Sequence, residues 1–261
     1  MRLLVSVVSA AEAERALAGG ADVVDVKDPG EGALGAPAPR ILSEVVRAVG
    51  AVVPVSVALG DLPDLPHTAA LAARGAALSG AAYVKVGLRG VRELERAVAV
   101  MSAVADAVGD TAAVIAAAYA DARALDPPAL EPAWLPALVE RTGIAGALVD
   151  TLVKDGRGLY GWLSEVELTD LIDRTRRAGA MFGVAGQLRR GELARVDADV
   201  VGVRSVVCRR GDRAADLDTD LVAAAVGELR TGQAGTIRVP AERPGPLTTT
   251  VMPVRRTASG R

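Results

Sequence analysis

The chain has 261 residues, of which 51% are hydrophobic and 24% charged, and its formal net charge is −2. This composition is typical of a globular protein with a substantial core. The balanced charge gives no basic stripe, and six aromatic side chains offer little surface for stacking bases, so we expect no nucleic-acid partner. One cysteine and one histidine exclude a disulfide framework and a Cys/His metal cluster, so we expect no metal and no cofactor.

The N-terminal segment gives no sign of a membrane-directed protein. The apolar run from Leu3 to Ala11 is too short to span a bilayer, and Glu12 and Glu14 follow it at once, unlike a signal peptide. We therefore expect a cytoplasmic protein without a membrane partner. Its Ala-rich helical segments can pack on a second copy or face water, so a homo-oligomer stays open.

Short β-branched apolar runs alternate with amphipathic stretches along the chain. The predicted strands span residues 3–8, 23–27, 53–59, 82–87, 112–118, 146–153, 181–185 and 200–207. The predicted helices span 10–18, 39–49, 68–79, 91–108, 132–142, 164–178, 189–195 and 218–230. Eight such units predict parallel pairing and an α/β fold, a single (β/α)8 TIM-type barrel formed by residues 1–230. A doubly wound sheet is the alternative, although no Gly-x-Gly-x-x-Gly follows the first strand.

Two segments depart from this alternation. Residues 231–261 are rich in Pro, Thr, Gly and Arg, which predicts a mobile, disordered C-terminal tail. Residues 29–39 form a connection that is long for a strand-to-helix loop, and we expect it to lie over the mouth of the barrel.

Lysine is scarce and its positions are informative. Only three of the 30 basic residues are lysines, Lys27, Lys85 and Lys154, and each falls near the end of a different predicted strand. Chemistry in such barrels lies at the carboxyl ends of the strands. The period of two in a strand puts Asp25 on the face of Lys27, and Asp150 on the face of Lys154. These five residues are the candidate catalytic group, with a purely structural ion-pair network as the alternative.

A lysine amine near other cations has a lowered pKa and becomes a nucleophile toward carbonyl groups. A second lysine can then move protons, and an aspartate can orient the amine or accept a proton. The residues alone do not rank the three lysines. They suit a class I aldolase or a related lyase.

A phosphorylated substrate is favoured by the loops after the seventh and eighth predicted strands, where such barrels often bind phosphate. Gly186 and Gly202 permit close approach of the backbone, and Ser205 and Arg204 supply a hydroxyl and a guanidinium. Gln187 follows in the first of these loops. These five residues are the candidate phosphate-binding group.

Several strings resemble the (5-formylfuran-3-yl)methyl phosphate synthases of methanofuran-type cofactor biosynthesis. They are LLVSV (3–7), GGADVVDVKDPGEGALGA (19–36), SVALGDLP (56–63), GAALSGAAYVKVGL (75–88), AYAD (118–121), LVDTLVKDG (148–156), VVGVR (200–204) and CRRGDR (208–213). The long DVKDPxEGxLGA string is the most specific. Gln187 and Ser205 depart from the smaller residues expected in the phosphate loops.

The resemblance implies a TIM-like barrel that condenses two glyceraldehyde 3-phosphate molecules into a phosphorylated furan aldehyde, releasing phosphate and water. It is thus expected to be a carbon–oxygen lyase of the class I aldolase type. By resemblance, Lys27 forms the Schiff base, Lys85 is the acid–base residue, and Asp25, Asp150 and Lys154 support them. The alternatives are another imine-forming aldolase on a phosphorylated sugar, a sugar-phosphate isomerase without an imine, and a binding barrel without activity.

Overall fold

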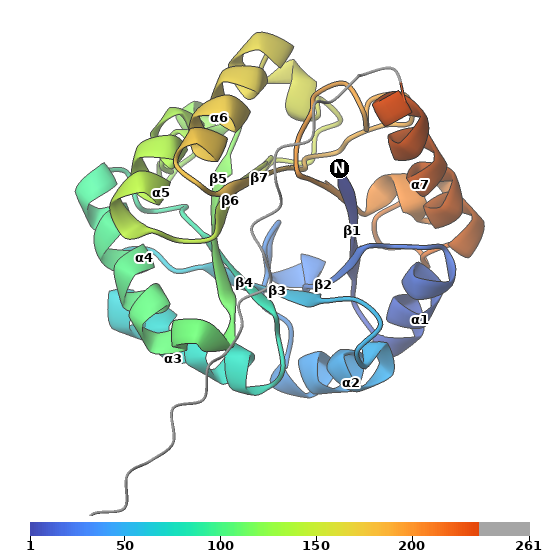
Figure 1. Cartoon of the computed structure of the whole chain (residues 1–261), viewed down its shortest axis with the longest axis horizontal. Helices are drawn as coiled ribbons and strands as arrows, with labels where there is room; N and C mark the ends of the chain where they lie inside the picture. Colours follow the sequence, from blue (N-terminus) through green and yellow to red (C-terminus); the bar gives the residue numbers. More distant parts are fainter. Residues whose placement is uncertain (235–261) are drawn as a thin grey trace, which may run out of the picture.

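The structure, a computed structural model, describes residues 1–234. Eight parallel strands close into a barrel in chain order, and the helices surround it as a ring (Figure 1). The strands are β1 (Arg2–Val7), β2 (Val23–Val26), β3 (Val55–Asp61), β4 (Tyr83–Gly87), β5 (Ala113–Tyr119), β6 (Gly146–Asp150), β7 (Met181–Val184) and β8 (Val200–Val203). The predicted (β/α)8-type barrel is confirmed, and a doubly wound sheet is wrong because β8 pairs with β1.

Within the described part of the chain, seven α-helices lie outside the barrel: α1 (Ala10–Ala18), α2 (Pro39–Val49), α3 (Pro66–Leu78), α4 (Leu94–Val108), α5 (Leu135–Thr142), α6 (Glu165–Arg177) and α7 (Thr219–Ala234). Local sequence sets their starts. Ser9 accepts a hydrogen bond from the backbone of Glu12 at the start of α1, and Ser164 forms a reciprocal capping box with Glu167 at the start of α6.

The prediction of an eighth helix over 189–195 is wrong, because this segment between β7 and β8 forms turns. A seven-residue helix has few internal hydrogen bonds to offset its nucleation. The segment instead uses side chains as acceptors. Glu228 of α7 accepts from the backbone of Gly191 and Leu193 at 2.9 and 3.0 Å, and Glu192 accepts from the backbone of Arg189 at 2.9 Å.

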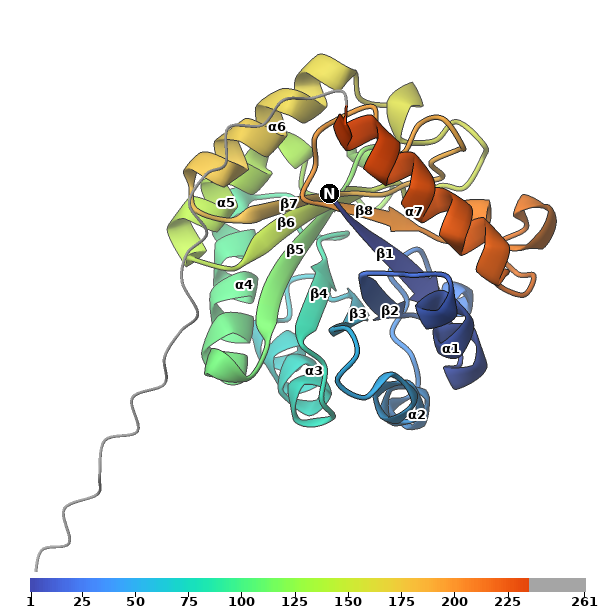
Figure 2. The same ribbon diagram turned by 45° about the vertical axis from the view of Figure 1, so that its right-hand side comes forward.

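The last helix closes the ring. Figure 2 shows α7 lying along β1 and α1, so the last helix packs on the first strand and the first helix of the barrel. The helix α7 extends to Ala234, whereas the last predicted helix ends at residue 230. The predicted disorder of residues 235–261 lies outside the described residues. No helix within residues 1–234 has both the length and the apolar character needed to cross a membrane.

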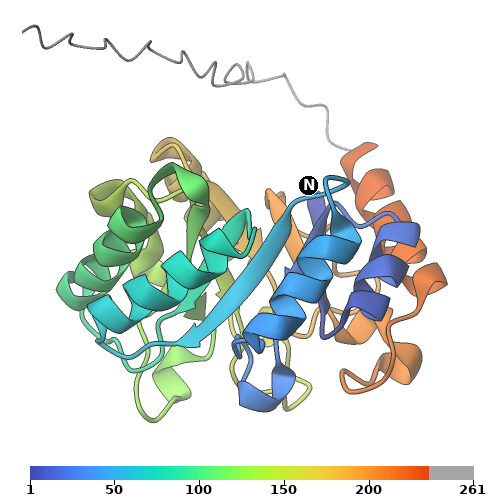
Figure 3. The ribbon, with the colours of Figure 1, turned by 90° about the horizontal axis from the view of Figure 1, so that it is seen from below.

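The direction of the strands determines the end of the barrel at which the predicted site residues lie. Alternate residues of β1, such as Leu3, Val5 and Val7, are fully buried in the hydrophobic core, and Leu4 and Ser6 lie among the residues that line the barrel pockets. In Figure 3 the N terminus lies at one end of the barrel and the arrowhead of β3, in light blue, points toward the other. Because all pairs are parallel, the carboxyl ends of the eight strands meet at that second end.

Candidate active site

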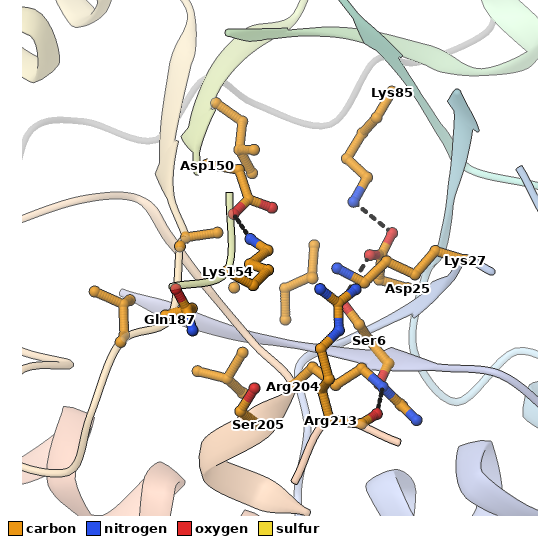
Figure 4. A pocket seen from close by; sticks show the side chains of 17 residues that line it. Ser6, Asp25, Lys27, Lys85, Asp150, Lys154, Gln187, Arg204, Ser205 and Arg213 are labelled. Atoms are coloured by element: carbon orange, nitrogen blue, oxygen red, sulfur yellow. Dashed lines mark hydrogen bonds and ion pairs between the residues drawn. The ribbon is translucent and has the colours of Figure 1, made fainter. Parts of the chain in front are cut away.

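A pocket at the carboxyl ends of the strands gathers all ten predicted site residues (Figure 4). The five candidate catalytic residues come from β2, β4 and β6 with its following loop, and the five candidate phosphate-binding residues come from the segments after β7 and within or after β8. Residues that are far apart in the sequence therefore share one cavity. Their co-location makes this pocket the candidate active site.

Asp25 and Lys85 form a buried ion pair inside the barrel. Lys85 Nζ lies 2.7 Å from Asp25 Oδ1, and both side chains are at most 4% exposed. Ser6 of β1 donates its hydroxyl to Asp25 Oδ2 at 3.0 Å. Removing two charges from water is costly unless they are paired. Here the ion pair offsets this cost, and the Ser6 hydroxyl adds a hydrogen bond to the carboxylate. The arrangement holds a lysine and a carboxylate in contact where a proton can pass between them.

Lys27 follows β2 directly and is 8% exposed. Burial lowers the pKa of its amine from 10.5 to about 8, although Asp150 and Asp25 oppose this shift and Lys85 adds to it. Its Nζ donates to the backbone carbonyl of Ala33 at 3.2 Å. A lysine with a pKa near 8 has a sizeable fraction of free amine near neutral pH. Lys27 thus has the character of a nucleophile toward a carbonyl carbon.

Asp150 and Lys154 form a second pair, on the opposite side of the pocket from Lys85. Lys154 Nζ lies 2.9 Å from Asp150 Oδ1 and also donates to the backbone carbonyl and the hydroxyl of Thr151. Burial raises the pKa of Asp150, but Lys154 and Lys27 outweigh it and hold this pKa below its ordinary value. Asp150 is therefore an anion that faces both lysines.

The prediction that Asp150 and Lys154 share one face of a strand is wrong, although the two side chains are in contact. The strand β6 ends at Asp150 rather than at residue 153, so Lys154 does not share a strand face with Asp150. The chain turns back after β6 because Asp121 accepts from the backbone of Leu152 and Val153 at 2.9 and 2.8 Å. This turn returns the Lys154 amine to the carboxylate.

The loop between β2 and α2 is fastened over the mouth. The backbone of Asp28 donates to the carbonyl of Gly35, and the backbone of Gly60 donates to the carbonyl of Leu34, each at 2.9 Å. Ala33 and Leu34 are at most 3% exposed and pack on Tyr119 inside the barrel mouth. The loop therefore holds the Ala33 carbonyl against Lys27.

Gly35→Ala is expected to displace this loop, because a Cβ at position 35 would overlap the Asp28 carbonyl and the Glu31 backbone. We expect a loss of about 1–3 kcal/mol in the free energy of unfolding together with reduced activity. Denaturant unfolding and turnover measure both. Gly75→Ala is the matched control, because a Cβ there meets nothing within 4 Å in the middle of α3, and we expect it to leave activity unchanged. Equal behaviour of the two variants would contradict the role given to the loop.

The segments after β7 and β8 approach the pocket closely. Gly186 has φ +112°, and a Cβ there would lie 3.0 Å from the backbone nitrogen of Thr151. A Cβ on Gly202 would lie 3.1 Å from the Cβ of Ala185. Gln187 lines the pocket and accepts a hydrogen bond from Gly156 at 3.3 Å, with its own backbone at φ +49°. These positions need a small residue or a tolerant backbone, as expected of a surface that fits close to a ligand.

Arg204 lines the pocket, but its guanidinium is engaged by the protein. It donates to Glu12 at 2.8 and 3.3 Å, to the Ser6 carbonyl at 3.0 Å and to the Arg213 carbonyl at 2.8 Å. Both Arg204 and Glu12 are at most 6% exposed at their side chains. The phosphate-binding role expected for Arg204 therefore competes with a buried ion pair, and this role stays a prediction.

Three residues that line the pocket or contact its ion pairs are not among the site residues predicted from the sequence: Ser6, Thr151 and Arg213. Ser6 had a detectable signal, since it is a polar residue inside the apolar run Leu3–Val7 and falls on the inward face. Arg213 belongs to the segment 208–213 but has nothing in its local pattern to set it apart from Arg209 and Arg210. Within residues 1–234, no group of three or more His, Cys, Asp and Glu side chains could hold a metal ion.

A family model for 4-HFC-P synthase matches residues 3–226. The chain belongs to this family. Among similar proteins, the (5-formylfuran-3-yl)methyl phosphate synthase of Methanococcus maripaludis strain C7 is 42% identical over 219 residues, which is 82% of this chain and 92% of that protein. The synthase of Methanocaldococcus jannaschii is 40% identical with the same coverage. The resemblance inferred from the sequence strings is confirmed.

Solved structures support the barrel of this 4-HFC-P synthase family member. Phosphoribosyl anthranilate isomerase from Thermotoga maritima has a TM-score of 0.61 at 14% identity, covering 88% of this chain and 99% of that one. Orotidine 5′-phosphate decarboxylase from Pyrococcus horikoshii has a TM-score of 0.59 at 16% identity, covering 87% and 99%. At such identities the likeness shows the fold alone.

Proposed function

We propose that this enzyme condenses two glyceraldehyde 3-phosphate molecules into (5-formylfuran-3-yl)methyl phosphate, releasing phosphate and water, through a Schiff base on Lys27. The observation that carries the proposal is the buried Lys27 amine, with its pKa lowered to about 8, between two lysine–aspartate pairs. The names of the relatives support the product, and the chemistry of the pocket supports the imine. In reaction type this is a carbon–oxygen lyase related to class I aldolases.

The first step joins Lys27 to one triose. The neutral amine attacks the aldehyde carbon, and the resulting carbinolamine loses water to give a protonated imine. This cation withdraws electrons from the adjacent carbon, so its proton becomes removable. The negative charges of Asp150 and Asp25 both act on Lys27, which favours the positive charge of the iminium.

The two ion pairs are suited to the proton transfers. Lys85 is held at 2.7 Å from Asp25 and Lys154 at 2.9 Å from Asp150. Each ammonium group can give a proton to the substrate, and its aspartate can accept the proton that the substrate loses and return it to the amine. We assign acid–base work chiefly to Lys85, because it is the more buried of the two lysines and is shielded from bulk water. Asp150 and Lys154 support the iminium and its proton transfers.

Carbon–carbon bond formation follows from the same intermediate. Loss of the α proton converts the iminium to an enamine, elimination of phosphate from one triose gives a reactive fragment, and aldol addition joins the two carbon skeletons. Ring closure and dehydration then give the furan, and hydrolysis of the imine by one water molecule releases the aldehyde and the free Lys27 amine. The fastened loop over the mouth limits the access of water to the enamine.

The phosphate groups are proposed to bind at the segments after β7 and β8. Gly186, Gln187, Gly202 and Ser205 line the pocket on that side, and such loops of TIM-type barrels commonly present backbone N–H groups to phosphate. In this proposal the phosphate end of the triose lies across the cavity from Lys85.

The proposal is tested by product analysis. The purified protein is incubated with glyceraldehyde 3-phosphate, and mass spectrometry with ultraviolet absorbance follows a furan aldehyde phosphate and released phosphate. Formation of this product supports the proposal. A lysine adduct without a furan would indicate another imine-forming aldolase, and a rearranged triose without any adduct would indicate an isomerase.

A pH profile gives a second expectation. Because Lys27 must be neutral to attack, kcat/KM should rise with pH through an apparent pKa of about 8 and level off above it. In Asp150→Asn the rise should move to lower pH, because Asp150 raises the pKa of Lys27. Initial rates from about pH 6 to about pH 10 measure both curves. A profile unchanged in position by the substitution would argue against Lys27 as the titrating nucleophile.

A further inference from the structure

Charge pairing in the pocket leaves two cations without a carboxylate. Five cationic residues and two aspartates line the cavity. Lys85 forms an ion pair with Asp25, and Lys154 forms one with Asp150. Arg204 forms an ion pair with Glu12, which is not among the residues that line the pocket. Among the residues lining this pocket, Lys27 and Arg213 are therefore the cations that form no ion pair with a carboxylate. Lys27 is already assigned to the imine, so the Arg213 guanidinium is a positive charge with no function yet.

The backbone around Arg213 is fixed. Its carbonyl accepts from the buried Nε of Arg204 at 2.8 Å. The Asp212 carboxylate accepts from the backbone of Ala214 at 2.9 Å, and the segment that carries them is joined to itself through a bridge between Cys208 and Leu217. Arg204 thus ties the segment after β8 to β1 through the Ser6 carbonyl and to α1 through Glu12.

The side chain of Arg213 extends into the pocket from this segment (Figure 4). It is half-buried, and within residues 1–234 its guanidinium makes no ion pair or hydrogen bond with a protein acceptor. Other arginines of the described chain form short ion pairs, such as Arg141 with Glu95 at 2.6 Å. An arginine fixed by its backbone but unpaired at its guanidinium has its hydrogen-bond donors available to a ligand.

We propose that Arg213 binds the phosphate group of the triose substrate. The inference rests on the proposed function for its substrate class. Gly186, Gln187 and Ser205 line the same cavity, so the guanidinium shares the pocket with the segments after β7 and β8 that are proposed to bind phosphate. The planar guanidinium matches two phosphate oxygens.

The use of arginine here also fits the chemistry. A lysine at position 213 would add a second amine without a carboxylate partner, and this amine would compete with Lys27 for the aldehyde substrate. The guanidinium keeps its proton and is not an amine nucleophile, so it supplies charge without competing with Lys27.

Arg213→Ala is tested with two aldehydes in the full-length protein. The rate of borohydride-dependent labelling of Lys27 is measured with glyceraldehyde 3-phosphate and with unphosphorylated glyceraldehyde. We expect a decrease of about 10- to 100-fold with the phosphorylated aldehyde, the range for loss of a charged hydrogen bond, and a nearly unchanged rate with glyceraldehyde. Arg209→Ala, an exposed arginine of the same segment, is the matched control and should change neither rate.

Direct binding of inorganic phosphate provides an independent readout. Calorimetric titration of wild type and Arg213→Ala should show weaker phosphate binding by a similar factor in the variant, whether or not the protein makes a furan. An equal loss with both aldehydes, or unchanged phosphate binding, would overturn the role of Arg213. Failure of wild type to label Lys27, with phosphate binding still dependent on Arg213, would instead overturn the imine mechanism alone.

Discussion

Lys27→Met should abolish turnover while leaving the protein folded. Methionine is an unbranched apolar side chain one heavy atom shorter than lysine, and it has no amine, so no imine can form. Loss of a catalytic nucleophile typically lowers kcat by a factor on the order of 10⁴ to 10⁶. Furan formation from glyceraldehyde 3-phosphate measures this loss, and circular dichroism with thermal unfolding checks the fold.

The change in the free energy of unfolding caused by Lys27→Met has a predictable sign. The folded protein lowers the pKa of Lys27 from 10.5 to about 8, so ionised Lys27 is destabilised on folding by roughly 3 kcal/mol. Lys27→Met removes this cost, and its free energy of unfolding near neutral pH should equal or exceed that of wild type. Wild type should also gain stability between about pH 8 and pH 10.5, because the unfolded chain then binds more protons, and the variant should lack this gain. A destabilised, active variant would contradict the role of Lys27.

The second large effect is expected at the pair inside the barrel. Lys85→Met leaves Asp25 fully buried without its cation, which should lower the free energy of unfolding by about 3–5 kcal/mol. Turnover should fall by about 10²- to 10⁴-fold, the usual range for a general acid–base group. Denaturant unfolding and single-turnover rates measure the two quantities.

The double variant Asp25→Asn/Lys85→Met separates the two effects. Both charges are gone, and the amide oxygen introduced at position 25 can still accept from Ser6, so we expect most of the lost stability to return. Activity should stay low because the proton carrier is absent. Recovery of activity together with stability would mean that the pair is structural only.

The barrel could be predicted from the sequence because periodicity carries it. The β-branched runs and the amphipathic stretches between them give seven of the eight predicted helices and all eight strands, with ends shifted by a few residues. The error at 189–195 has a specific origin. Acceptors for its backbone come from Glu228 on α7, a tertiary contact that no local pattern contains.

The candidate site could be predicted as a set of residues but not as a set of contacts. The three lysines and two aspartates were visible because strand ends converge in a barrel. The partners were not visible: strand periodicity pairs Asp25 with Lys27, whereas the structure pairs Asp25 with Lys85. Arg204 likewise looked free in the sequence, because Glu12 precedes it by 192 residues.

The most direct test of the imine mechanism is borohydride trapping with glyceraldehyde 3-phosphate, followed by peptide mass spectrometry. We expect one reduced adduct, on the peptide that carries Lys27, in wild type and none in Lys27→Met. An adduct on Lys85 or Lys154 with Lys27 unmodified, or furan formation by Lys27→Met, would contradict it.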